Sequence, residues 1–245
     1  MLANKHSAFA SLQKEILQLA GFKNIHNTLI DSKLWPISES FPNRSFPVGA
    51  VHEFLVPEAG ADAATNGFIG GLLSSLMGNS GAVLWISNSR TVFPPALINL
   101  GLRSDRFVFV DLRRDKDVIW AMDEALKCAS LSAVVGEVHD LNFTESRRLQ
   151  LAVEQSEVTG FVVRNNSKSP GTTACISRWK ITSLPSEPIE NLPGIGYPKW
   201  KVELLRIRNG KPGKWEVEFK NNRFYVLNDQ SSQAVTPYQK IQLAG

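Results

Sequence analysis

Hydrophobic and polar positions follow two periods along the chain, and their order predicts the elements of the fold. Short continuous apolar runs are typical of buried parallel strands, and they predict strands at 51–56, 82–87, 107–111, 133–136, 159–164 and 174–181. Helical spacing between these runs predicts helices at 66–77, 93–100, 115–129 and 144–155. Strands that alternate with helices of this kind indicate an α/β fold, in which a mostly parallel sheet carries helices on both faces.

The segments on either side of this core have different patterns. Apolar positions at 7–19 predict an amphipathic helix that docks either on its own core or on a second molecule, and the proline-containing stretch 24–48 predicts a linker or wrapping arm. Alternation returns at 200–207, 214–219 and 224–227, which predicts an antiparallel meander at the sheet edge. The predicted organisation is therefore an N-terminal helix and arm (1–45), a core with its antiparallel extension (46–228) and a flexible tail (229–245).

The composition is that of a soluble globular protein, with 245 residues, 43% hydrophobic and 20% charged. The chain begins without a signal-peptide pattern and has no apolar run long enough to span a membrane, so we expect a cytoplasmic protein without membrane contact. Cys128 and Cys175 lie far apart in apolar surroundings, which predicts two buried thiols in a reducing compartment. The four histidines have no metal-ligand spacing, so no metal site is predicted.

Positive charge is concentrated in the last part of the chain. The net charge is +4, and from residue 197 onward nine Lys and Arg stand against four acids. Cations in a row bind nucleic-acid phosphates, so the candidates for DNA binding are Arg206, Arg208, Lys211 and Lys214. Aromatic residues close to them either stack on bases or belong to the core of the sheet, and these are Trp200, Trp215 and Tyr225.

The stretch between the first strand and the first core helix has the pattern of a phosphate-binding loop without its chemistry. Its residues are Pro57, Glu58, Ala59, Gly60, Ala61, Asp62 and Ala63. A strand, a turn of small residues and a helix N-terminus favour anion binding, but hydrolysis also needs a Lys on the phosphates and a Ser or Thr on the metal ion. Asp62 and Ala63 occupy those places, and Asp62 is explained by the positive end of the helix dipole. We therefore predict a vestigial loop, no cofactor and no enzymatic activity.

The order of these elements resembles the RecA recombinase core over residues 45–225, and the sequence 53–58 is similar to the residues that lead into the RecA phosphate loop. Gly136-Glu137, 146–152 and Ser177-Arg178-Trp179 are more specific, and they resemble the ImuA family. That family consists of RecA-related accessory proteins of bacterial mutagenic translesion synthesis, and it is related to the cell-division inhibitor SulA.

The resemblance implies a RecA-like P-loop NTPase fold and assigns two further positions. The activating glutamate of RecA falls at Ser89, and the aspartate that supports the metal ion falls on Glu137, so both are predicted to be vestigial metal or base positions. The loop with which RecA grips DNA corresponds to the shortened stretch 165–171. Together with Asp62 and Ala63, these differences imply that ATP-driven strand exchange is absent.

The function implied by the resemblance is that of an adaptor in the SOS response and in mutagenic translesion synthesis. Its partners would be an inactive Y-family polymerase-like protein of the ImuB type and, through it, an error-prone replicative-type polymerase, with the RecA filament and single-stranded DNA as further candidates. The similarity around Arg147 and Arg148 favours partner binding there and on the N-terminal arm, although a solvated or salt-bridged face is an equal explanation. A divergent RecA-type DNA-dependent ATPase and a SulA-like division inhibitor remain alternatives.

Overall fold

The computed structural model describes residues 28–58, 61–77, 81–89, 92–165, 170–187 and 196–229. The helix predicted at 7–19 and residues 230–245 of the predicted tail lie outside these ranges. Within them, no helix is long and apolar enough to cross a membrane.

The described strands form one nine-stranded sheet in the order β3-β2-β4-β5-β1-β6-β7-β8-β9. The first six strands of this order are parallel to one another, and they are β1 (Val51–Val56), β2 (Ala82–Ser87), β3 (Phe107–Asp111), β4 (Leu131–Val138), β5 (Thr159–Asn165) and β6 (Ser177–Leu184). An antiparallel half continues from β6 with β7 (Lys199–Ile207), β8 (Gly213–Lys220) and β9 (Arg223–Asp229). The predicted parallel sheet with an antiparallel meander at its edge is confirmed.

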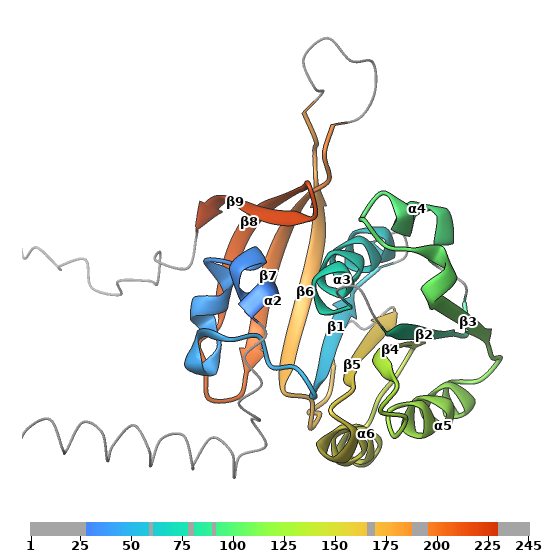
Figure 1. Ribbon diagram of the computed structural model, residues 1–245. Helices are drawn as coiled ribbons and strands as arrows, with labels where there is room; N and C mark the ends of the chain where they lie inside the picture. The colour runs from blue at the N-terminus through green and yellow to red at the C-terminus, as the bar shows by residue number, and fades with distance from the viewer. Residues whose placement is uncertain are drawn as a thin grey trace, which may run out of the picture.

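Helices cover both faces of the parallel strands, as predicted (Figure 1). Helices α3 (Asp62–Leu76) and α4 (Pro94–Ile98) lie on one face, and α5 (Asp115–Ala125) and α6 (Phe143–Ser156) lie on the other. Side chains of β1 alternate between the two cores, since Val51 packs with α5 and α6 whereas Phe54 packs with α3. β1 is therefore buried on both faces, which explains its continuous apolar run.

Helix α3 contains glycines because the antiparallel half of the sheet packs directly against it. A Cβ atom added at Gly71 would lie 2.6 Å from Cζ of Phe224 and 3.0 Å from Cε2 of Phe219. Two aromatic rings therefore occupy the space that any larger residue would need. The small residues of α3 join the parallel and antiparallel halves into one core.

Part of the stretch predicted as an arm folds against the antiparallel half of the sheet. It contains α2 (Thr28–Lys33) and the 3₁₀ turns η1 (Ile37–Ser40) and η2 (Pro42–Arg44). Its buried side chains are Ile30, Leu34, Ile37, Phe41 and Phe46. Asp31 fixes the segment by accepting hydrogen bonds from Oγ of Ser45 at 2.7 Å and from the Phe46 N–H at 2.8 Å. The five buried apolar side chains of this segment are part of the main hydrophobic core.

Several predicted boundaries and one predicted burial were wrong. Helix α3 begins at Asp62, four residues before the predicted start, and β6 begins at Ser177 instead of residue 174. The backbone at Ile176 leaves the regular ladder because its N–H donates to O of Val51 while its own carbonyl accepts from the Arg208 N–H. Helix α5 ends at Ala125, so Cys128 lies in the turn that follows and is exposed. Cys175 is buried, as predicted.

Candidate functional site

The predicted phosphate loop lies at the carboxyl end of β1, in the middle of the sheet between β5 and β6. Ala59 and Gly60 lie outside the described residues. On either side of them, the N–H of Ala61 donates to O of Glu58 at 3.3 Å, and α3 begins at Asp62. Asp62 therefore lies in the first helical turn, where a negative charge is stabilised by the helix dipole.

The two positions predicted to be vestigial metal or base residues are brought together. Glu137 is completely buried on β4, and its carboxylate accepts hydrogen bonds from Nε1 of Trp85 at 2.7 Å and from Oγ of Ser87 at 2.9 Å. Oγ of Ser89 donates to the same carboxylate at 3.3 Å and accepts from Nδ2 of Asn165 at 3.4 Å. Both oxygens of Glu137 thus bind neutral donors of the protein, which ties the carboxyl ends of β2, β4 and β5 together.

A buried ionic cluster lies beside the loop, and sequence reasoning had not assigned it. Glu53 on β1 is completely buried and accepts hydrogen bonds from Nη1 of Arg164 at 2.7 Å and from Nε of Arg178 at 2.7 Å. Oγ1 of Thr173 also donates to it at 2.9 Å, and Arg164 pairs in turn with Asp140. The cluster joins β1, β5 and β6, which are adjacent in the sheet. Because each charge has an opposite partner, burial is tolerated.

Two of the four predicted DNA-binding residues hold the backbone that leads into β6. Nη2 of Arg206 donates to the carbonyl oxygens of Thr173 at 3.0 Å and Cys175 at 2.9 Å. Nη2 of Arg208 donates to O of Ala174 at 3.1 Å. These guanidinium groups therefore stabilise the segment before β6 instead of pointing away from the protein.

The other two predicted DNA-binding residues are exposed on the β7–β8 hairpin. Nζ of Lys214 lies 3.1 Å from Oε1 of Glu203, and Nζ of Lys180 lies 4.0 Å from the other oxygen of that carboxylate. Glu203 thus offsets part of the positive charge of Lys180 and Lys214. Trp200 and Trp215 are buried in the core, whereas Tyr225 is exposed. For the two tryptophans, the core alternative is confirmed.

Arg147 and Arg148, the predicted partner-binding residues, both lie on the exposed side of α6. Arg148 reaches across to α5, where its Nη2 lies 3.0 Å from Oδ2 of Asp123. Arg147 lies 3.8 Å from Glu154 of its own helix. Asn142 begins the helix with a capping box, in which its side chain and that of Glu145 bind each other's backbone N–H groups. The arginines are thus displayed on a well-anchored helix.

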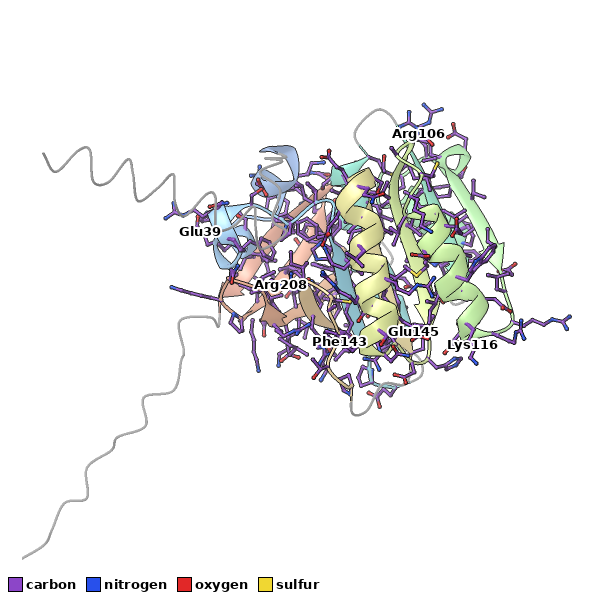
Figure 2. The ribbon with its side chains drawn as sticks, turned by 90° about the horizontal axis from the view of Figure 1, so that it is seen from below. Glu39, Arg106, Lys116, Phe143, Glu145 and Arg208 are labelled. Carbon is purple, nitrogen blue, oxygen red and sulfur yellow. The ribbon has the colours of Figure 1, made fainter. Side chains whose placement is uncertain are left out.

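Three exposed apolar residues on α5 and α6 were missed by the sequence analysis. Phe143 and Leu151 are 55% and 46% exposed, and they lie four residues before and after Arg147 on α6. Trp120 of α5 is 62% exposed, and Figure 2 shows α5 and α6 side by side, with Phe143 at the amino end of α6. The helical pattern contained the signal, because Trp120 lies two residues from Val118 and from Met122, two apolar positions that α5 buries.

A cavity of about 310 Å³ lies at the carboxyl ends of β2 and β3. Its lining is mainly apolar, with two aromatic rings and one carboxylate, and consists of Trp85, Ser87, Val92, Pro94, Phe109 and Asp111. Among the described residues, no group of three or more His, Cys, Asp or Glu side chains is arranged to hold a metal ion.

The fold and these contacts define a mixed α/β protein with a mostly parallel sheet flanked by helices and extended by antiparallel strands. No protein-family model matches the chain. The chain is, however, 33% identical over 196 residues to Protein ImuA of two strains of Caulobacter vibrioides, NA1000 / CB15N and CB 15, and the match covers 74% of this chain and 80% of each relative. The chain therefore belongs to the ImuA family, as its sequence motifs predicted.

A second relative is more distant. Cell division inhibitor SulA of Photorhabdus laumondii subsp. laumondii is 28% identical over 104 residues, which cover 42% of this chain and 59% of SulA. Membership in the ImuA family, together with this weaker relation, supports an accessory role in the SOS and mutagenesis pathway.

Proposed function

We propose that the chain is a non-catalytic adaptor of SOS-induced mutagenic translesion synthesis. Its principal partner would be an inactive Y-family polymerase-like protein, through which it recruits an error-prone polymerase in the cytoplasm. The observation that carries the proposal is the exposed side of α6, where Phe143, Arg147 and Leu151 follow one another at four-residue intervals. We call these three residues, with Arg148 and with Trp120 of the neighbouring helix α5, the α5–α6 face.

The chemistry of the α5–α6 face suits a protein partner. Tryptophan and arginine are over-represented among the residues that contribute most to protein–protein binding. Arg148 is already held by Asp123 at 3.0 Å, so less side-chain freedom is lost when a partner binds. Phe143 and Leu151 supply apolar area on the same helix. The face therefore combines anchored cations with exposed hydrophobic groups, as expected of an interface.

A non-catalytic role is supported by the residues around the loop. We propose that the core descends from a RecA-like P-loop fold in which Asp62 places a negative charge where a phosphate would bind. Ala63 has no hydroxyl group for a metal ion, and the carboxylate of Glu137 binds Trp85, Ser87 and Ser89. These substitutions affect anion binding, metal binding and catalysis separately, which favours an adaptor over the ATPase alternative.

Direct DNA contact would be secondary to protein binding. The side chains of Arg206 and Arg208 bind backbone carbonyl groups of the chain itself. Lys211 and Lys214 are exposed, and we propose them as the DNA-contacting residues of the hairpin. Their binding to single-stranded DNA would be weak and would decrease as salt increases, because released counterions drive it.

The test compares two double substitutions that each remove two positive charges. Arg147→Ala with Arg148→Ala should weaken binding to the immobilised polymerase-like protein by at least about tenfold. Lys211→Ala with Lys214→Ala, the matched control, should leave that affinity unchanged while reducing binding to single-stranded DNA. Both variants should keep the wild-type melting temperature. Equal partner affinity for all three proteins would contradict the proposed face, and unfolding of the α6 variant would contradict its assignment to the surface.

A division inhibitor of the SulA kind is the second candidate, and the relation to SulA is the observation that favours it. This function predicts that overproduction of the chain makes cells grow into filaments in the absence of DNA damage. The adaptor function predicts cells of normal length under the same conditions. Microscopy of induced cells therefore separates the two functions.

A further inference from the structure

Strand β3 is an edge of the sheet that lacks the protection edge strands usually have. Across the described ranges β3 is hydrogen-bonded only to β2, and their register runs from Phe107 to Asp111 without a bulge. Val108 is 53% exposed and Phe109 is 37% exposed, on opposite faces of the strand. Soluble proteins normally protect such edges with lysine, proline or bulges. An apolar, regular and open edge indicates a site where another strand pairs.

The opposite edge of the sheet has this protection. Strand β9 begins with the charged Arg223, and its register with β8 is interrupted between Glu216 and Val217. The interruption disfavours the addition of another strand, whereas the register of β2 with β3 is continuous. The two edges of the same sheet therefore differ in regularity, and β3 is the edge better suited to pairing.

The backbone shows which residues of β3 face outward. The N–H of Leu112 donates to O of Ser87 on β2 at 2.9 Å. Because successive residues of a strand direct their backbone groups to opposite sides, those of Val108 and Val110 also face β2. Those of Phe107, Phe109 and Asp111 face away from the sheet. The outward set is symmetric about Phe109.

We propose that β3 pairs with β3 of a second copy of this chain, antiparallel to it, about a two-fold axis through Phe109. In this register Phe109 lies opposite Phe109 of the second copy, and Phe107 lies opposite Asp111, so that all outward residues form hydrogen-bonded pairs. On the other face of the sheet, Val108 lies opposite Val110 of the second copy. The two nine-stranded sheets become one continuous sheet.

Charge and shape also favour a second copy as the occupant. Antiparallel pairing places the 3₁₀ turn before β3 (Ser104–Arg106), in which Asp105 already binds Arg103, beside Asp111 and Arg113 of the other copy, so groups of both signs meet at each end. The Cα atoms of the two Phe109 residues would lie about 5.5 Å apart. The phenyl ring from the second copy would then lie on the same face of the sheet as the cavity that Phe109 lines. Pairing would cover exposed apolar groups of both copies at once.

A dimer formed at β3 would leave the α6 residues of both α5–α6 faces open, because α6 packs beneath β1 and β5, away from the β3 edge (Figure 1). One assembly could then hold two molecules of the proposed partner. The proposal of a dimer is based on the geometry of β3 and does not depend on the identity of that partner.

The test uses charge at the two-fold axis. Light scattering during gel filtration of the full chain should show a wild-type dimer, and Phe109→Lys or Phe109→Glu should each raise its dissociation constant by about tenfold or more, because like charges would face each other. An equimolar mixture of the Lys and Glu variants should restore the dimer. Leu227→Lys on β9, the control at the opposite edge, should leave it unchanged.

Cross-linking supplies a second measurement that needs no stable charge variant. Phe109→Cys, in a chain that also carries Cys128→Ser, should form a disulfide-linked dimer under mild oxidation, since a Cα separation of about 5.5 Å fits a disulfide. Leu227→Cys in the same chain should not. The proposal would be overturned by a wild-type monomer at the highest soluble concentration, by a dimer that survives both charge variants, or by cross-linking at residue 227 instead of 109.

Discussion

Acidification should destabilise the protein because His52 is buried in its neutral form. His52 lies completely buried on β1 with its ring stacked against Phe46 and Phe161, at centroid distances of 4.5 and 5.7 Å. Its Nε2 lies 2.7 Å from O of Pro47, and since a carbonyl only accepts, this nitrogen carries the proton. Nδ1 accepts a hydrogen bond from Oγ of Ser177 at 2.7 Å. Burial lowers the pKa of His52 to about 4.

The magnitude follows from the difference between the folded and unfolded states. A histidine in an unfolded chain has a pKa of about 6.5. Above that pH the ring is neutral in both states, so the protonation of His52 does not reduce the free energy of unfolding. Below about pH 6.5 His52 binds a proton in the unfolded state but stays neutral in the folded state. The free energy of unfolding therefore decreases until the pH reaches about 4. A difference of about 2.5 pKa units corresponds to about 3 kcal/mol.

Urea denaturation followed by tryptophan fluorescence at several pH values between 7 and 4 measures this loss. His52→Gln provides the comparison, because an amide donates to the Pro47 carbonyl but does not titrate. The variant should have a lower free energy of unfolding than the wild type at pH 7. The difference between the two free energies of unfolding should decrease by about 3 kcal/mol between pH 7 and pH 4. Two curves that stay parallel over this range would refute the reasoning.

Three further predictions concern stability and nucleotide binding. Glu53→Gln should lower the free energy of unfolding by about 3 kcal/mol in urea denaturation, because it leaves the buried guanidinium group of Arg164 and the partly buried one of Arg178 without their shared carboxylate. Gly71→Ala should cost about 1–2 kcal/mol despite its better helix propensity, since the ring of Phe224 blocks the added methyl group, whereas Gly171→Ala, with nothing within 4 Å, should be neutral by the same measurement. Calorimetry with ATP and magnesium should give no binding heat, and micromolar affinity would contradict the assignment of the loop as vestigial.

The parallel half of the sheet could be predicted from the sequence because its strands are short continuous apolar runs, including the partly exposed edge strand β3. Strands β1, β2 and β3 coincide with apolar runs at 51–56, 82–87 and 107–111, and their limits agree to the residue. The start of β6 could not be predicted in the same way. Residues 174–176 are as apolar as the strand that follows, and only the bonds of Ile176 to Val51 and Arg208 show that the regular ladder begins later.

The candidate site was less predictable, because a charge pattern does not identify its partner. Arg206 and Lys214 look equivalent in the sequence, yet one binds carbonyl groups of its own chain and the other lies on the surface beside Glu203. Ser89 and Glu137 were assigned only through the resemblance to RecA, and they meet at the carboxyl ends of β2 and β4. The two arginines around Glu53 joined it only through the tertiary fold.

Damage-induced mutagenesis in cells tests the adaptor function most directly. A chromosomal Arg147→Glu, Arg148→Glu variant should reduce the frequency of ultraviolet-induced mutations to the level of a deletion strain, because reversed charges would prevent the proposed docking of a polymerase-like partner on the α5–α6 face. Immunoblotting should show wild-type amounts of the variant protein. Normal mutagenesis in cells that contain this variant would contradict the account, since it would show that the α5–α6 face is not needed.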